Sequence, residues 1–180
     1  MIKINNTNKL VKASFLLAIA IVFQFLGRTF PEISQIFVGP AVNAILLLTV
    51  SICGLWYGVA VGALTPILAF ILGQLPTPFG PFIPFIIVGN LLYVYIFNLF
   101  IKGKINKQAI GVIIGSILKF AFLFISSNYI ISALKIIGNQ AVVSKLAIAM
   151  GILQLITSLL GGTVALIIIE ILKKRKRDII

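Results

Sequence analysis

Nearly all of the few charged residues in this chain lie between long apolar stretches and not within them. The sequence has 180 residues, with fifteen Lys and Arg but only three Asp and Glu. Lys and Arg accumulate in the cytoplasmic segments of membrane proteins, so clusters of them predict points on the cytoplasmic side of a bilayer, separated by even numbers of crossings. Three segments hold most of the cations: the first dozen residues (Lys3, Lys9, Lys12), a link (Lys102, Lys104, Lys107) and the C-terminus (Lys173, Lys174, Arg175, Lys176, Arg177).

The composition agrees with a membrane protein. Hydrophobic residues make up 61% of the chain and the mean hydropathy is +1.20, whereas soluble domains contain about 45–50% apolar residues. A net charge of +12 would suggest a nucleic-acid partner in a soluble protein. Here the basic residues flank apolar runs, so they indicate membrane topology and contact with anionic lipid, and we expect no nucleic-acid partner.

Several kinds of chemistry are excluded by the residues that the chain lacks. The sequence contains no His and a single cysteine, Cys53, so it offers neither a Cys/His metal site nor His-based catalysis. The three acids, Glu32, Glu170 and Asp178, do not form the facing pair that intramembrane aspartyl proteolysis needs, and they are too few for a carboxylate proton relay. No Gly-rich phosphate loop is present either. We therefore expect no enzyme activity, no cofactor and no metal.

The apolar runs predict the fold class. A helix needs about 20 apolar residues to cross the hydrocarbon core. We expect an all-α membrane protein, a compact bundle of six transmembrane helices with both termini cytoplasmic, and residues 1–180 as a single six-helix transmembrane domain. The six runs are 11–30, 41–54, 58–73, 84–101, 108–134 and 145–172.

The connections follow from turn-forming residues. We expect a loop at 32–40, closed by Gly39-Pro40, and a turn at 54–58. The stretch 74–84 holds four prolines and cannot be regular helix. The runs 41–54 and 58–73 are each shorter than a full span. They could form a re-entrant hairpin, but two short spans are the preferred interpretation.

Small residues recur at four-residue spacing within these runs. In lipid, such residues let helix backbones approach closely and gain van der Waals contact. We therefore interpret them as packing positions inside the bundle. The pairs are Gly58/Gly62, Gly111/Gly115, Ala147/Gly151 and Ser158/Gly162.

Lys119 is the strongest candidate for a functional residue. It lies near the middle of the run 108–134, where a charge costs on the order of 2.5–3.5 kcal/mol on insertion scales and needs a partner or a cavity. Two interpretations remain open: Lys119 contacts a substrate, or it is a structural lysine bonded at the centre of the bundle.

Amide side chains occur at matching depth on four of the predicted helices. Gln24, Asn43, Asn90 and Gln154 all fall in the outer half of their runs. Each alone could be a contact between helices, but together they predict a pocket open to the outside. Tyr93 follows Asn90 by three residues and joins the candidates.

Three further candidates lie near the outer ends of the runs. Arg28 either pairs with Glu32 across Pro31 or presents its guanidinium to an acidic group of a ligand. Gln74 begins the stiff Pro-rich segment, which could cover the pocket as a lid and offer aromatic surface to a ring. Asn128 is nine residues from Lys119, about 180° around the helix, so it reaches the same cavity only if the helix is distorted.

The layout resembles the substrate-capturing S component of an energy-coupling factor (ECF) vitamin transporter. The opening run from Lys9 to Ile19 is similar to the first-helix pattern of that family, usually Ala-x-x-x-Ala, with Ser14 at the first position and Ala18 at the second. The runs 39–44 and 54–58 and the pair Gly89-Asn90 are also similar to members of the group.

The resemblance implies a function. Such a protein lies in the bacterial plasma membrane as a multi-pass subunit and binds a vitamin-like small molecule from outside. It then associates with a transmembrane coupling subunit, which contacts the small residues Ser14 and Ala18, and with two ATPase subunits. The cations Lys119 and Arg28 favour a ligand with a carboxylate or phosphate, and the aromatic residues favour a ring. The alternative is a non-transporting integral-membrane assembly or scaffold subunit, in which the polar residues only join helices.

Overall fold

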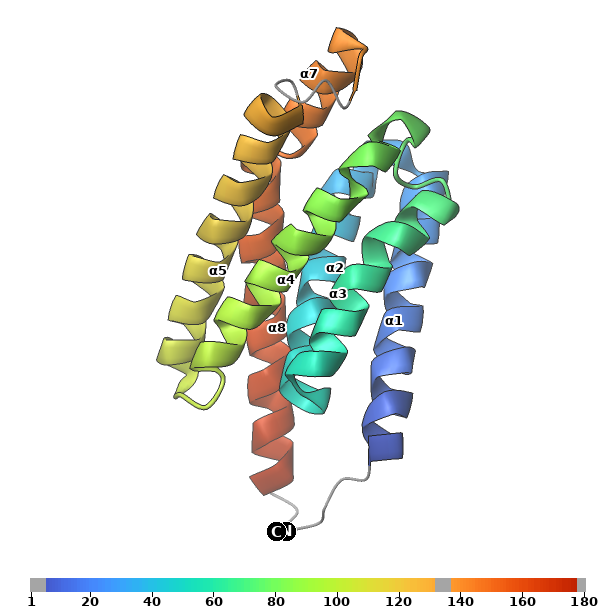
Figure 1. Ribbon diagram of the computed structural model, residues 1–180. Coiled ribbons are helices and arrows are strands. Elements are labelled where there is room, and N and C mark those ends of the chain that lie inside the picture. The colour runs from blue at the N-terminus through green and yellow to red at the C-terminus, as the bar shows by residue number, and fades with distance from the viewer. Residues whose placement is uncertain (1–5, 132–136, 178–180) are drawn as a thin grey trace.

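The protein is a bundle of long helices (Figure 1). The computed structural model describes residues 6–131 and 137–177, without the side chains of residues 31–35 and 176–177. Its helical elements are α1 (Asn6–Thr29), α2 (Pro31–Cys53), α3 (Leu55–Ile71), the 3₁₀ helix η1 (Thr77–Phe82), α4 (Ile83–Phe100), α5 (Ile105–Ile125), the π-helical segment η2 (Ser126–Ile130), α7 (Gln140–Ala149) and α8 (Ile152–Arg177). Five spans are long and apolar enough to cross a membrane.

The loop predicted at residues 32–40 is wrong, because α2 already begins at Pro31. Proline is well suited to the first turn of a helix, where its missing N–H costs nothing. Gly39-Pro40 then lies inside α2, where Gly39 packs against Thr157 and Pro40 lies beside Gly161, both on α8. Membrane helices tolerate such residues when a neighbouring helix covers the site.

α2 runs toward the lower end of the bundle in Figure 1, and α3 runs back beside it. α2 has 23 residues, about 34 Å at 1.5 Å per residue. α3 has 17 residues, which makes it the one short apolar helix of the described chain. The predicted five-residue turn reduces to Gly54, whose φ of 105° favours glycine.

The Pro-rich segment contains no α-helix before Ile83. Residues Thr77–Phe82 instead form one 3₁₀ helix, and Pro84 lies in the first turn of α4. Gly73, with a φ of 74°, ends α3 and directs the chain into this segment.

The sequence predicts one helix for the sixth span, 145–172, but the structure has two helices there. α7 ends at Ala149 and α8 begins at Ile152, with a break at Met150-Gly151. Asn139 caps α7, since its side chain accepts a 3.0 Å hydrogen bond from the N–H of Ala141. The fifth span changes from α5 to the π-helical segment η2 at Ser126.

Packing divides the interior into two apolar clusters. α2 packs against α8, α1 and α3, while α4 packs against α5 and α3. The inner cluster is formed mainly by residues 44–48 and Val50 of α2, with Tyr93, Phe97 and Val112. The outer cluster joins η1, α5 and α7: Phe79, Phe82, Leu123, Ile131, Val143, Leu146 and Met150.

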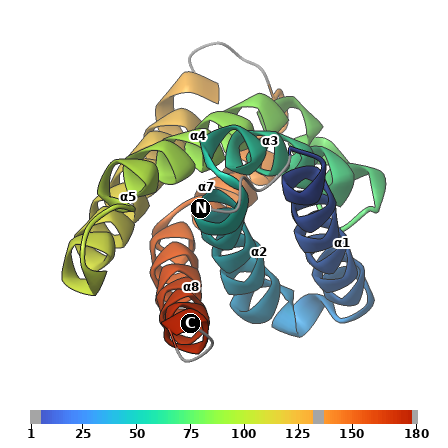
Figure 2. The same cartoon turned by 90° about the horizontal axis from the view of Figure 1, so that it is seen from below.

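The ends of the bundle differ in charge. The start of α1, the α4–α5 link and the end of α8 lie at the same end, the lower one in Figure 1 and the near one in Figure 2. We call this the basic end. Its described cations are Lys9, Lys12, Lys102, Lys104, Lys107, Lys173, Lys174 and Arg175.

Candidate functional site

A cavity of about 460 Å³ lies in the half of the bundle away from the basic end. It is bordered by the end of α1, the middle of α2, the second half of α3, the segment after α3, and the α7–α8 break. Its volume falls in the range of about 300–1,000 Å³ that is usual for small-molecule sites. The described polar lining residues are Gln24, Arg28, Asn43, Thr65, Gln74, Asn90, Lys119, Gln154 and Thr157.

Lys119 lies at the deep side of the cavity and is 3% exposed. Its Nζ donates to Asn43 Oδ1 at 2.6 Å and to Asn90 Oδ1 at 2.9 Å. The two asparagines are held in turn, because Asn43 Nδ2 donates to the carbonyl of Gly39 and Asn90 Nδ2 to that of Gly62, each at 3.0 Å. One buried cation therefore joins α2, α4 and α5 at the wall of the cavity.

Tyr93 lies beneath this cluster and closes it toward the basic end. Its ring centroid is 5.5 Å from Lys119 Nζ, within cation–π range. Its hydroxyl donates to the carbonyl of Ser158 on α8 at 2.7 Å. The ring is fully buried, and Gly115 and Gly162 leave the room that it occupies. Tyr93 thus supports Lys119 without itself lining the cavity.

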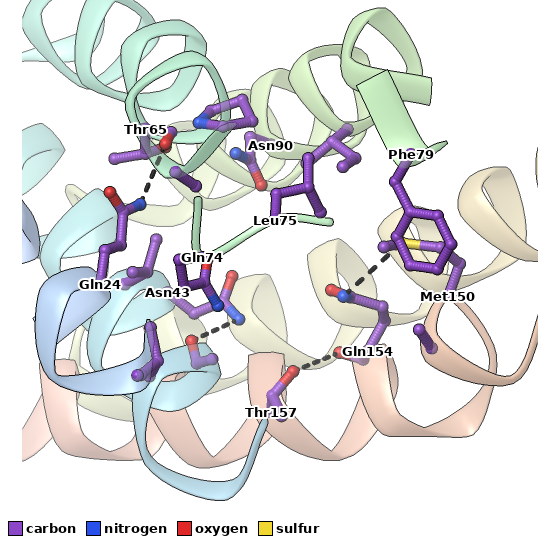
Figure 3. Close-up of a pocket in the computed structure, with 18 of the residues that line it drawn as sticks. Gln24, Asn43, Thr65, Gln74, Leu75, Phe79, Asn90, Met150, Gln154 and Thr157 are labelled. Atoms are coloured by element: carbon purple, nitrogen blue, oxygen red, sulfur yellow. Dashed lines mark hydrogen bonds between the residues drawn. The ribbon is translucent and has the colours of Figure 1, made fainter. Parts of the chain in front are cut away.

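The side walls of the cavity carry amides and hydroxyls (Figure 3). On one side Gln24 Nε2 donates to the carbonyl of Thr65 at 2.9 Å, which joins α1 to α3. On the other side Gln154 Nε2 lies 3.8 Å from the sulfur of Met150, a weak acceptor. Thr157 donates to the carbonyl of Gln154 one turn earlier in α8.

The outer part of the cavity is more apolar. Leu75, Pro76 and Phe79 approach from the Pro-rich segment, opposite Met150 and Leu153 at the α7–α8 break; Leu75, Phe79 and Met150 are drawn in Figure 3. This matches the prediction that the Pro-rich segment approaches the pocket. Arg28 is exposed and lines the mouth, close to Gly73. The side chain of Glu32, its predicted alternative partner, lies outside the described residues.

Six of the eight residues predicted to bind substrate line this one cavity: Lys119, Asn90, Gln154, Asn43, Arg28 and Gln74. Asn128 is not among the described lining residues, and its side chain bonds to the carbonyl of Phe124 in its own helix. Sequence reasoning did not select Thr65 or Met150 as site residues. Thr65-Pro66 interrupts an apolar run and was a usable signal, whereas Met150 looks like any core residue.

Ser14 and Ala18, the predicted coupling positions, lie on an outward face of α1. Both are exposed, in contrast to Ala13 and Ala20, which are buried against the bundle. The neighbouring side chains Phe15 and Val22 are also more than half exposed. This face is uncovered among the described residues of the chain.

Comparison with known proteins identifies the family. The sequence model of the ECF transporter substrate-specific component matches residues 8–173, nearly the whole chain. No curated protein sequence and no solved structure matches. Proteins of this family are integral membrane subunits that bind substrate for transport, which agrees with the apolar spans of the chain. The chain therefore belongs to the family of substrate-specific components of ECF transporters.

Proposed function

We propose that this protein captures a vitamin or a related small molecule from outside the cell in the cavity around Lys119. It delivers this substrate inward together with a transmembrane coupling subunit and two ATPase subunits. Residues 1–180 act as one substrate-binding domain, with both termini cytoplasmic. The exposed face with Ser14 and Ala18 is the surface for the coupling subunit, because small residues allow a partner helix to approach closely.

The observation that carries this proposal is the convergence of buried polar groups on one cavity. Lys119, Asn43 and Asn90 are each less than 5% exposed, and all three line the space. Polar side chains at membrane depth are expensive and usually mark a substrate pathway or a binding site. A purely structural cluster would gain nothing from an adjacent cavity of about 460 Å³.

The direction follows from the positive-inside rule. Eight of the described cations lie at the basic end, away from the cavity. The other three are the buried Lys119, Arg28 at the mouth of the cavity and Lys145 on α7. If the basic end faces the cytoplasm, the cavity opens toward the outside.

A pocket-filling variant tests the site. Ala149 is half-buried and lines the cavity at the end of α7. Ala149→Trp should weaken binding by about tenfold or more, because the indole occupies ligand space. Binding is measured by thermal shift and calorimetry on the purified full chain, against a panel of vitamins. The matched control is Ala60→Trp, at an exposed position of α3 outside the cavity lining.

Wild-type affinity in Ala149→Trp would mean that the ligand binds elsewhere. If no small molecule of the panel bound and no ATPase complex co-purified with the chain, the scaffold alternative would replace the transport proposal.

A further inference from the structure

We infer that the substrate carries a single negative charge, as a carboxylate does, and that this group binds at the deep side of the cavity against Lys119. This inference rests on the proposed function, and it concerns the class of substrate, not the existence of the site. The argument depends on what surrounds the ammonium group of Lys119.

No described carboxylate is placed to neutralise Lys119. Within the described helices the acids are Glu32 and Glu170. Glu32 precedes Asn43 by eleven residues along α2, which corresponds to about 16 Å of helix. Glu170 follows Ser158, the partner of Tyr93, by twelve residues along α8, or about 18 Å. Both separations are far longer than a glutamate side chain.

The two asparagines solvate Lys119 but do not cancel its charge. An ammonium group has three donors, and Asn43 and Asn90 accept two of them. The third N–H group of Lys119 has no hydrogen-bond acceptor among the described residues. The nearby Tyr93 ring stabilises a cation electrostatically, yet it too is uncharged. A buried cation in this state favours an anionic partner, since leaving a buried charge unpaired is costly.

The rest of the cavity limits how much negative charge the ligand carries. Among the described lining residues Lys119 is the only buried cation, and the other charged one, Arg28, is exposed at the mouth. The space between them is lined by neutral amides and hydroxyls and by the apolar side chains of Leu75, Phe79 and Leu153. One deep charge followed by a mixed, largely apolar wall fits a monoanion with a neutral ring or chain, and it disfavours cations and polyphosphates.

Matched pairs of compounds test the charge requirement on the purified full chain in nanodiscs. Each pair keeps the skeleton and removes the charge: biotin and its primary amide, nicotinate and nicotinamide, pantothenate and pantothenol. Thiamine serves as a cationic probe. We expect at least one acid to bind about ten- to a hundredfold more tightly than its neutral twin, as loss of a charge-assisted hydrogen bond implies.

Variants then assign the preference to Lys119. Lys119→Met should abolish the tighter binding of the acid relative to its neutral analogue, and Lys119→Arg should keep it. Asn43→Asp should also remove the preference for the acid. The oxygen that lies 2.6 Å from Lys119 Nζ would then belong to a carboxylate of the protein, which neutralises the ammonium group. The matched control is Lys145→Met, which deletes an exposed cation on α7 outside the cavity lining and should leave the preference unchanged.

The outcomes separate the two proposals. If size-exclusion chromatography shows that Lys119→Met is not folded, Asn43→Asp decides whether Lys119 causes the preference for the acid. Binding of a neutral twin as tightly as its acid, or binding of thiamine, would overturn the monoanion inference and leave the cavity as a binding site. If no acid bound at millimolar concentration but a neutral compound did, the same inference would fall. If nothing bound at all, the monoanion inference would be wrong, and if in addition no ATPase complex co-purified with the chain, the proposed function would be wrong as well.

Discussion

Gly161 is a residue at which α8 packs directly against the backbone of α2. A Cβ at this position would come within 2.7 Å of Asn43 Cβ and 3.0 Å of the backbone nitrogen of Ala44, and closer still to the carbonyl oxygen of Pro40. Backbone atoms cannot move aside as a flexible side chain can. The contact therefore requires glycine, and it lies directly beside one of the two asparagines that hold Lys119.

Gly161→Ala should destabilise the protein by about 1–3 kcal/mol, because the added methyl group overpacks the contact between α2 and α8. We expect a lower midpoint of thermal unfolding in detergent and weaker ligand binding, since Asn43 must shift. Gly138→Ala is the control, at an exposed position where an added Cβ meets nothing within 4 Å. Equal midpoints for the two variants would contradict the close approach of α2 and α8.

Lys119 has features of both roles that the sequence left open, a contact to substrate and a structural lysine. The lysine is bonded to Asn43 and Asn90, as a structural lysine would be, and it lines the cavity, as a ligand-binding lysine would. Its depth in an apolar run was readable from the sequence. Its partners lie 76 and 29 residues away, and the sequence contains no local signal that selects them.

At the scale of elements, η1 and α7 form an outer layer over the cavity. They pack on the outer cluster, which shares none of its buried members with the inner cluster. Phe82 is fully buried there and stacks on Phe85, with ring centroids 5.1 Å apart. The outer layer is therefore held by buried residues that do not belong to the inner cluster.

Phe82→Ala should loosen the outer layer and leave the inner half intact. Deleting a buried ring costs about 3–5 kcal/mol, and we expect this cost to appear locally as faster amide hydrogen exchange in residues 75–86 and 140–150. The control, Phe97→Ala, removes an equally buried ring from the inner cluster and should speed exchange in residues 44–50. Uniform exchange across the bundle in both variants would mean that the two clusters unfold as one unit.

For the whole molecule, the decisive feature is that its cavity is lined by the end of α1, the second half of α3 and the α7–α8 break. These parts lie away from the basic end (Figure 1). Lys and Arg near membrane spans orient a chain with that side toward the cytoplasm. The cavity, the Pro-rich segment 74–84 and the outer cluster would then all face the exterior.

Single-cysteine labelling in intact cells tests this orientation in a Cys53→Ser background. Thr77 in η1 and Asn106 at the start of α5 are both exposed, at opposite ends of the bundle. Thr77→Cys should react with a membrane-impermeant maleimide in intact cells. Asn106→Cys should react only after the membrane is permeabilised. The reverse pattern would invert the topology and with it the direction of capture.

The connections between elements were predicted less well than the elements. The loop expected at 32–40 is part of α2, and the single span expected at 145–172 is broken at Met150-Gly151. Gly and Pro are local signals for a turn. At Gly39-Pro40 the tight contact with α8 is more important than that signal, and such a contact is invisible until the helices are packed.

The sequence by itself determined the class of the protein: apolar runs long enough for membrane helices, charges kept between them, and amides at one depth on four helices. These properties follow from length, hydropathy and helical period, which are local. Only the tertiary structure decided that Lys119 meets Asn43 and Asn90, that Tyr93 lies beneath them, and that Asn128 does not line their cavity. Each of these depends on how a helix is rotated against its neighbours, and that rotation is set by close packing between residues far apart in the chain.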